Sequence, residues 1–146
     1  MTSLDAGKAC LFSKISGIIT LDGKPVANAK ITRTVNLNKD KVDHTYTDDK
    51  GYFEMPTIFQ RTVTQFLPLE FVVKQDIVVQ YNGNSYDIWS GVKRTPEENA
   101  ESRGEALKVQ CELNSEKTFK QVSNSPYISR CIWSAEPDKI DTGFDL

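Results

Sequence analysis

The chain has 146 residues, of which 38% are hydrophobic and 26% charged, and its formal net charge is −2. This length predicts one globular domain with its own core, and the small negative charge excludes a basic field that would attract nucleic acid. No apolar run approaches the ~20 residues of a membrane span. The start of the sequence lacks the apolar centre of a signal peptide, so we expect a cytoplasmic protein, or a periplasmic one if a signal has been removed.

Residues 15–56 predict two successive strand–turn–strand units. A β-branched run, Ile15 to Ile19, leads into Leu21–Pro25, where Asp22 and Gly23 tolerate positive φ and a proline follows. Residues 29–36 then alternate with the period of two of a half-buried strand. Residues 36–44 are polar and include the only histidine, so we expect an exposed loop there. Thr47–Gly51 predicts a turn, and Tyr52–Met55 the strand after it.

These two units resemble the carboxypeptidase-regulatory-like and transthyretin-like β-sandwich modules. In those modules a G-x-V-x-x-x-G-x-P-V-x-x-A-x-V strand pair is followed by T-D-x-x-G-x-F, and the resemblance covers about 40 residues. It implies an all-β, antiparallel β-sandwich. A closer resemblance is to a family of small bacterial proteins of unknown function, and it is carried by segments spread along the chain: Cys10–Ser13, Leu67–Glu70, Tyr81–Gly83, Trp89, Lys93–Arg94, Glu98–Asn99, Glu101 and Cys111–Leu113.

The second half of the chain predicts more strands and one short helix. Residues 57–69 are ambiguous and are interpreted as a loop that crosses between sheets. Alternation from 70 to 81, Asn82-Gly83 and a return strand from Ser85 to Trp89 predict a hairpin. Thr95-Pro96 begins a predicted helix to about Ser102.

The last elements are a strand over residues 107–113 and a hairpin with Asn124–Pro126 as its turn. Residues 135–146 form an acidic tail that we expect to be partly ordered. The prediction is therefore a single domain, 1–146, with its core at about 10–134 and one short helix.

Catalytic chemistry has few candidates in this sequence. A Ser-His-Asp or Cys-His set would have to use His44, which we interpret as a solvated loop histidine. The transthyretin-like enzymes that hydrolyse 5-hydroxyisourate use several histidines and a C-terminal Tyr-Arg-Gly-Ser, and this chain has neither. We therefore predict no catalytic residues and no cofactor.

Acidic residues offer two further alternatives. Asp40, Asp43, Asp48 and Asp49 could approach one another and bind calcium, but a turn needs Asp48 and Asp49 for backbone capping, and no metal site is predicted. Glu97, Glu98, Glu101 and Glu105 are interpreted as a solvated helix face.

The three cysteines leave their pairing open. Cys111 and Cys131 could form a disulfide that stabilises the fold by ~3 kcal/mol. They could equally be buried thiols that pack as small apolar residues.

The remaining signal is a recognition surface. Aromatic and charged residues of the kind enriched at protein interfaces are Tyr86, Trp89, Lys93, Arg94 and Glu98, with Asp43 and His44 in the predicted loop. Trp89 could instead belong to the core. We predict a non-catalytic protein-binding domain, in particular an immunity protein that binds a secreted bacterial effector. The alternative is a carbohydrate-binding or adhesive accessory module.

Overall fold

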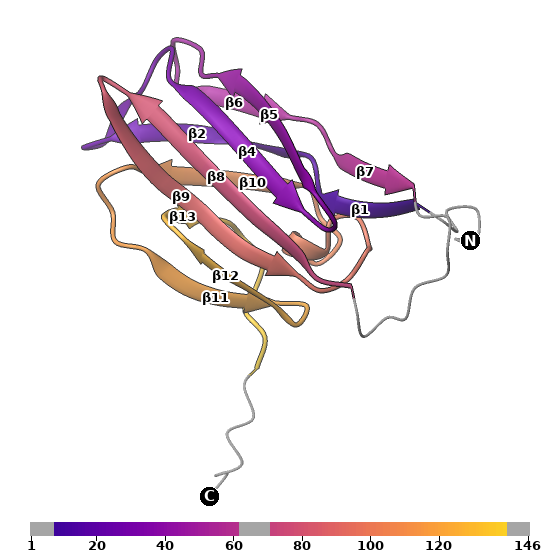
Figure 1. The fold of residues 1–146 in the computed structure, drawn as a ribbon. Helices are drawn as coiled ribbons and strands as arrows, with labels where there is room; N and C mark the ends of the chain where they lie inside the picture. Colours follow the sequence, from indigo (N-terminus) through magenta and orange to yellow (C-terminus); the bar gives the residue numbers. More distant parts are fainter. Residues whose placement is uncertain (1–7, 62–70, 140–146) are drawn as a thin grey trace, which may run out of the picture.

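The computed structural model describes residues 8–61 and 71–139, and it is an all-β sandwich (Figure 1). Two large sheets face each other across the core, and a two-stranded sheet lies at one end. In the described ranges the single helical element is a short 3-10 turn, η3 (Ala100–Ser102). The predicted all-β sandwich is therefore confirmed.

The larger sheet has six antiparallel strands in the order β11-β12-β9-β8-β4-β5. Their bounds are β4 (Lys30–Asn36), β5 (Asp40–Tyr46), β8 (Val73–Tyr81), β9 (Asn84–Lys93), β11 (Thr118–Val122) and β12 (Ser125–Ser129). The two predicted hairpins form here. Asn82 and Gly83 have the positive φ that a tight turn needs, at 51° and 78°. The last turn is made by Ser123 and Asn124, one residue earlier than predicted.

The second sheet is built around β2 (Ile15–Leu21). Its other strands are β3 (Lys24–Pro25), β6 (Tyr52–Met55), β10 (Leu107–Glu112) and β13 (Cys131–Ile132). β10 pairs with β2 in parallel, whereas β3 and β6 pair with β2 antiparallel. Strand β1 (Lys8–Phe12) pairs with β7 (Ile58–Arg61) in the separate two-stranded sheet.

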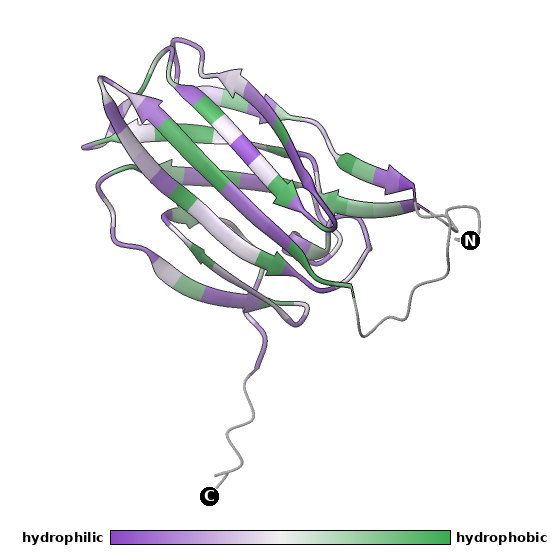
Figure 2. Ribbon diagram, in the orientation of Figure 1, coloured by the Kyte–Doolittle hydropathy of each residue, from purple (hydrophilic) through white to green (hydrophobic). Residues whose placement is uncertain are grey.

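Alternation along the strands creates the core. Ile31, Arg33 and Val35 of β4 point inward and are buried, and their neighbours are half-buried. Figure 2 shows hydrophobic and hydrophilic bands along β4. Arg33 is the one charged residue among these three inward residues of β4, and its guanidinium is fully buried. It donates to the Asp43 carboxylate at 3.0 and 2.7 Å and to the Pro56 carbonyl at 2.7 Å.

The expected loop at residues 36–44 is wrong, since Asp40–Tyr46 is a full strand, β5. Every residue of β5 pairs with a residue of β4, and residues 37–39 make the connection. The strand lies at the edge of the sheet and is only partly covered on its inner side, so both of its faces tolerate polar residues. The apolar alternation that marks a half-buried strand is therefore missing from its sequence.

The helix predicted for residues 95–102 is also wrong, apart from the turn at Ala100–Ser102. The carbonyls that would accept hydrogen bonds within such a helix accept them from other groups. The Pro96 carbonyl accepts from the Cys10 amide at 2.9 Å, and the Thr95 and Glu97 carbonyls accept from Lys93 Nζ at 2.6 and 2.5 Å. Positive φ angles at Asn99 and Arg103 end the turn on both sides.

Two other segments differ in part from the prediction. Of the expected crossing loop at 57–69, residues 58–61 are strand β7, and residues 62–69 lie outside the described ranges. The acidic tail packs on the domain as far as residue 139. Ala135 is buried, and the Asp138 carboxylate accepts hydrogen bonds from the amides of Ser123 and Asn124 at 2.9 and 2.8 Å. Residues 140–146 lie outside the description.

Candidate binding surface

The residues predicted to bind a partner do not form one site. Trp89 and Lys93 are fully buried, and Tyr86 is half-buried on β9. Arg94 and Glu98 are exposed in the connection that follows β9, whereas Asp43 and His44 are on β5, separated from β9 by two strands of the same sheet. Only Arg94, Glu98 and His44 of this set are exposed.

Trp89, which the sequence allowed in either the core or an interface, belongs to the core. Its ring lies 4.8 Å from that of Trp133, 5.1 Å from Tyr127 and 5.8 Å from Phe12, measured between centroids. Such tilted aromatic contacts at the centre of the sandwich stabilise packing. Trp89 therefore cannot contact a partner without unfolding.

A buried polar group, the Glu101 cluster, consists of Glu101, Ser13, Gln75 and Trp89. The Glu101 carboxylate accepts from the Ser13 hydroxyl at 2.5 Å, the Ser13 amide at 3.1 Å and Gln75 Nε2 at 3.0 Å. Gln75 in turn accepts from the Trp89 indole at 3.0 Å. All four side chains are 0% exposed. Glu101 was predicted on a solvated face, and that prediction is wrong.

Two other ionisable groups lie beside this cluster. Burial lowers the pKa of Lys93, and the charge of Glu101 opposes that change. Burial also raises the pKa of the Cys10 thiol, whose sulfur lies 3.5 Å from the Ser13 hydroxyl. A thiol with a raised pKa is a poor nucleophile. The arrangement ties β1, β8, β9 and residues 99–102 together, and its side chains are buried.

A second carboxylate, Glu112, binds residues at the end of β2, whereas Glu101 binds Ser13 just before the start of that strand. It accepts from the amides of Asn114, Gly23 and Asp22 at 3.0, 2.9 and 2.9 Å, and from the Thr20 hydroxyl at 2.9 Å. These donors, the Asn114 amide foremost, lower the pKa of Glu112 to about 2, although partial burial opposes them. Glu112 thereby fixes the turn between β2 and β3 against the end of β10.

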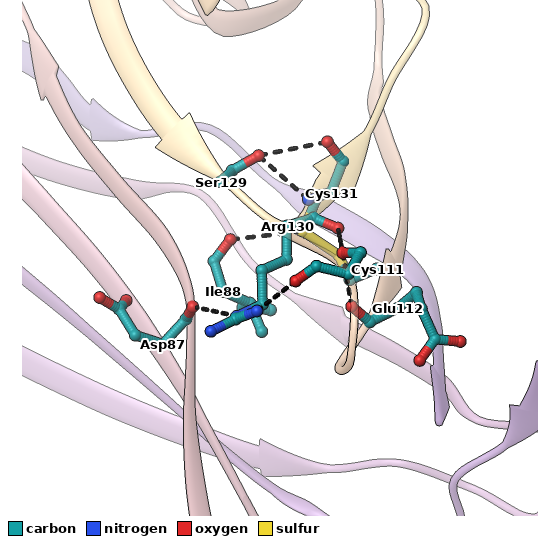
Figure 3. Close-up of a disulfide and its surroundings, with 8 residues drawn as sticks. Asp87, Ile88, Cys111, Glu112, Ser129, Arg130 and Cys131 are labelled. Carbon is teal, nitrogen blue, oxygen red and sulfur yellow. Dashed lines mark hydrogen bonds between the residues drawn. A yellow bond between two sulfur atoms is a disulfide. The ribbon is translucent and has the colours of Figure 1, made fainter. Parts of the chain in front are cut away.

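Cys111 and Cys131 form a disulfide between β10 and β13 (Figure 3). The two residues are direct partners in the antiparallel register. Arg130 lies beside the bond, and its guanidinium donates to the Asp87 carbonyl at 3.1 Å and to the Ser115 carbonyl. The bridge and these contacts anchor the two-residue strand β13, which would otherwise have little ladder to hold it.

The disulfide borders an open, largely apolar hollow of about 270 Å³ on the outer face of the second sheet. Ile132, Gln110 and Ile18 line it together with the disulfide. These three residues are register partners, and Tyr52 continues the series on β6. We call Ile132, Gln110, Ile18 and Tyr52 the outer row. Ile132 is 76% exposed, the highest value among the large exposed hydrophobic residues of the described ranges.

Sequence reasoning missed the roles of three residues: the buried acceptor Glu101, the turn-binding carboxylate Glu112 and the exposed Ile132. A weak signal existed for Ile132, because an isoleucine that alternates with Cys131 and Trp133 must face away from them. The two glutamates had almost none, since apart from the Asn114 amide their donors come from segments up to 92 residues away.

Two features are absent from the described residues. In residues 8–61 and 71–139 no group of three or more His, Cys, Asp and Glu side chains is placed to hold a metal ion. The same ranges contain no helix that is long and apolar enough to cross a membrane.

The fold and contacts define a disulfide-linked β-sandwich domain with a largely apolar hollow beside the outer row. A family model described as "Domain of unknown function (DUF6795)" matches residues 15–116, which is more than half of the chain, so the protein belongs to that family. Neither the curated proteins nor the solved structures contain a match.

Proposed function

We propose that the protein is a non-catalytic protein-binding domain, and specifically an immunity protein that binds and neutralises a secreted antibacterial effector. The observation that carries the binding role is the outer row, where Ile132 is 76% exposed beside an apolar hollow. Large hydrophobic side chains at the edge of a preformed hollow are typical of binding hot spots. The immunity role also draws on the resemblance to small bacterial proteins.

The rim of the hollow indicates the chemistry of the partner. Glu112 and Glu116 border it, and the one arginine there, Arg130, already donates to two backbone carbonyls. A partner that inserts an apolar side chain next to a lysine or arginine matches this rim. We therefore expect the effector to present such a pair of residues.

The disulfide favours an oxidising compartment, because disulfides persist there and are rare in the cytosol. This supports the periplasmic alternative over the cytoplasmic default. A periplasmic immunity protein would meet an effector that acts on the cell envelope or enters through the periplasm.

The carbohydrate-binding alternative has less support. Sugar recognition through stacking needs an accessible aromatic ring, and both tryptophans are packed in the core at 0% and 6% exposure. The exposed aromatic residues of the described ranges, Tyr46, Tyr52, Phe59 and Phe119, lie on four different strands, and of these Tyr52 alone belongs to the outer row.

The test is co-expression with the product of the adjacent gene, followed by size-exclusion chromatography and a growth-protection assay. We expect a stable complex and rescued growth, and Ile132→Lys should weaken the complex by at least about 100-fold, as loss of a hot spot does. Phe119→Lys is the matched control, because Phe119 is 58% exposed on the other sheet. If no complex forms and growth is not protected, the immunity role is wrong. If only Phe119→Lys weakens the complex, the surface is wrong.

A further inference from the structure

Strand β5 leaves one side of its backbone open. All seven of its residues pair with β4, and in the described part of the chain its other side pairs with no strand. The register has no bulge, and the strand contains no proline. Natural edge strands are usually short, bulged or interrupted by proline, because a regular open edge can pair with another chain.

The open backbone groups and the exposed side chains belong to the same residues. The Thr47 amide donates to the Ala29 carbonyl at 3.0 Å, in the same register as the β4–β5 ladder. Because bonded and non-bonded pairs alternate along an antiparallel ladder, the amides and carbonyls of Asp40, Val42 and His44 point away from β4. The side chain of Val42 is 61% exposed.

A charge on the inner face of an edge strand often prevents pairing, but here the acidic one is compensated. Lys41 and Asp43 both alternate onto this face, and buried Arg33 binds both carboxylate oxygens of Asp43 at 3.0 and 2.7 Å. Lys41 has no such compensation within the strand, so a partner strand must place an acidic residue opposite it. Asp43 keeps 34% side-chain exposure, so it can still contact a cation from outside.

We propose that β5 is the interface between two copies of this chain, which pair antiparallel about a twofold axis at Val42. In this register Val42 faces Val42 of the second copy, Lys41 faces Asp43, and Asp40 faces His44. Val42 with Val42 is an apolar pair, Lys41 with Asp43 joins a cation and an anion, and in the third pair the Asp40 carboxylate can accept a hydrogen bond from the His44 imidazole. Cross-strand pairs of this kind stabilise sheets. The proposal is independent of the outer row, which lies on the other sheet.

The neighbouring registers fit less well. An axis at Asp43 places this carboxylate against its own copy, and like charges directly opposite are destabilising. An axis at His44 places His44 against itself and loses both the Val42–Val42 and the Lys41–Asp43 pairs. The sequence of β5 is therefore self-complementary about Val42, as a twofold interface requires.

Sedimentation velocity of the full 146-residue chain over a wide range of concentrations tests the proposal. One strand pair buries less than a standard interface, so we expect a concentration-dependent dimer. Val42→Lys should abolish the dimer, and circular dichroism should confirm that the variant is folded. Phe119→Lys, on the other edge strand β11, should leave the dimer unchanged.

A charge exchange tests the register. Asp40→Lys alone and His44→Glu alone should each weaken dimerisation about tenfold, since each places like or unmatched charges opposite one another. The double variant should restore it, because opposite charges then face each other again. A monomer at all concentrations overturns the proposal, as does a dimer that survives Val42→Lys. Single variants that weaken the dimer without rescue by the double variant overturn the register at Val42.

Discussion

Two glutamates at opposite ends of the domain show how one residue type is used in two environments. Glu101 is fully buried and accepts three hydrogen bonds from Ser13 and Gln75 in the interior. Glu112 is partly exposed and accepts four, three of them from backbone amides of surface turns. Both carboxylates join segments that are distant in sequence.

The difference lies in what remains when the carboxylate is removed. Around Glu101, the donors and the charge of Lys93 would be left in a medium that cannot hydrate them. Around Glu112, water can replace the carboxylate at the exposed amides. Glu101 accepts one hydrogen bond fewer than Glu112, yet its removal should therefore lower stability more.

Glu101→Ala should lower the free energy of unfolding by about 3–5 kcal/mol, because it leaves the buried donors of Ser13 and Gln75 without their acceptor and removes a negative charge that favours the buried Lys93 ammonium. Urea denaturation followed by tryptophan fluorescence measures this. Glu98→Ala is the control, since Glu98 is exposed in the same connection and should change stability little. A loss below about 1 kcal/mol for Glu101→Ala would contradict the structural role of the cluster.

The Glu112 end has a covalent link as well, and its removal should have the second largest effect. Cys111→Ser combined with Cys131→Ser opens a loop with a sequence separation of 20, which should lower stability by about 3 kcal/mol. A reductant should lower the unfolding midpoint of the unmodified protein in the same way, and it should not affect the double variant. Thiol titration of the unfolded oxidised protein should find Cys10 alone. Equal midpoints with and without reductant would argue against the bond.

Glu112→Gln should lower stability by about 1–2 kcal/mol at pH 7, less than the full pKa change implies because the carboxylate is partly solvated. Its folded pKa of about 2 lies below the ordinary value of 4.5, so its contribution is complete above 4.5 and is lost as the pH falls through about 2. Urea titrations at several pH values should show the two proteins converging in acid. Glu116→Gln, a neighbouring exposed residue, should show no such convergence.

The smallest effect is expected at a surface ion pair. Lys117 and Asp87 approach to 3.1 Å, and their side chains are 39% and 43% exposed. Lys117→Ala should change stability by about 0.5 kcal/mol or less, and added salt should reduce the difference. A loss above about 1 kcal/mol would mean that solvent exposure does not explain why some polar contacts of this domain contribute more to stability than others.

The turns and the alternating strands could be predicted from the sequence because their signals are local. Asp22-Gly23 and Asn82-Gly83 identify hairpins through backbone conformation, and residues 73–81 identify a strand through period-two burial. Strand β5 could not be recognised, because an edge strand covered on little of its surface does not need apolar alternation. The predicted helix failed because the distant Cys10 amide takes the Pro96 carbonyl, and because the nearby Lys93 side chain is buried and takes the carbonyls of Thr95 and Glu97.

For the binding surface, the sequence could name residue types but not their side of the sheet. Trp89 and Lys93 have interface chemistry, yet both are buried, whereas Ile132 and Val42 have core chemistry and are exposed. The sequence by itself determined the all-β class and the positions of its tight turns, since these depend on φ preferences and on neighbouring residues. The tertiary structure decided which glutamate is buried, which strands form edges and that Cys111 meets Cys131. These outcomes depend on contacts between segments far apart in the chain, whose geometry no local pattern contains.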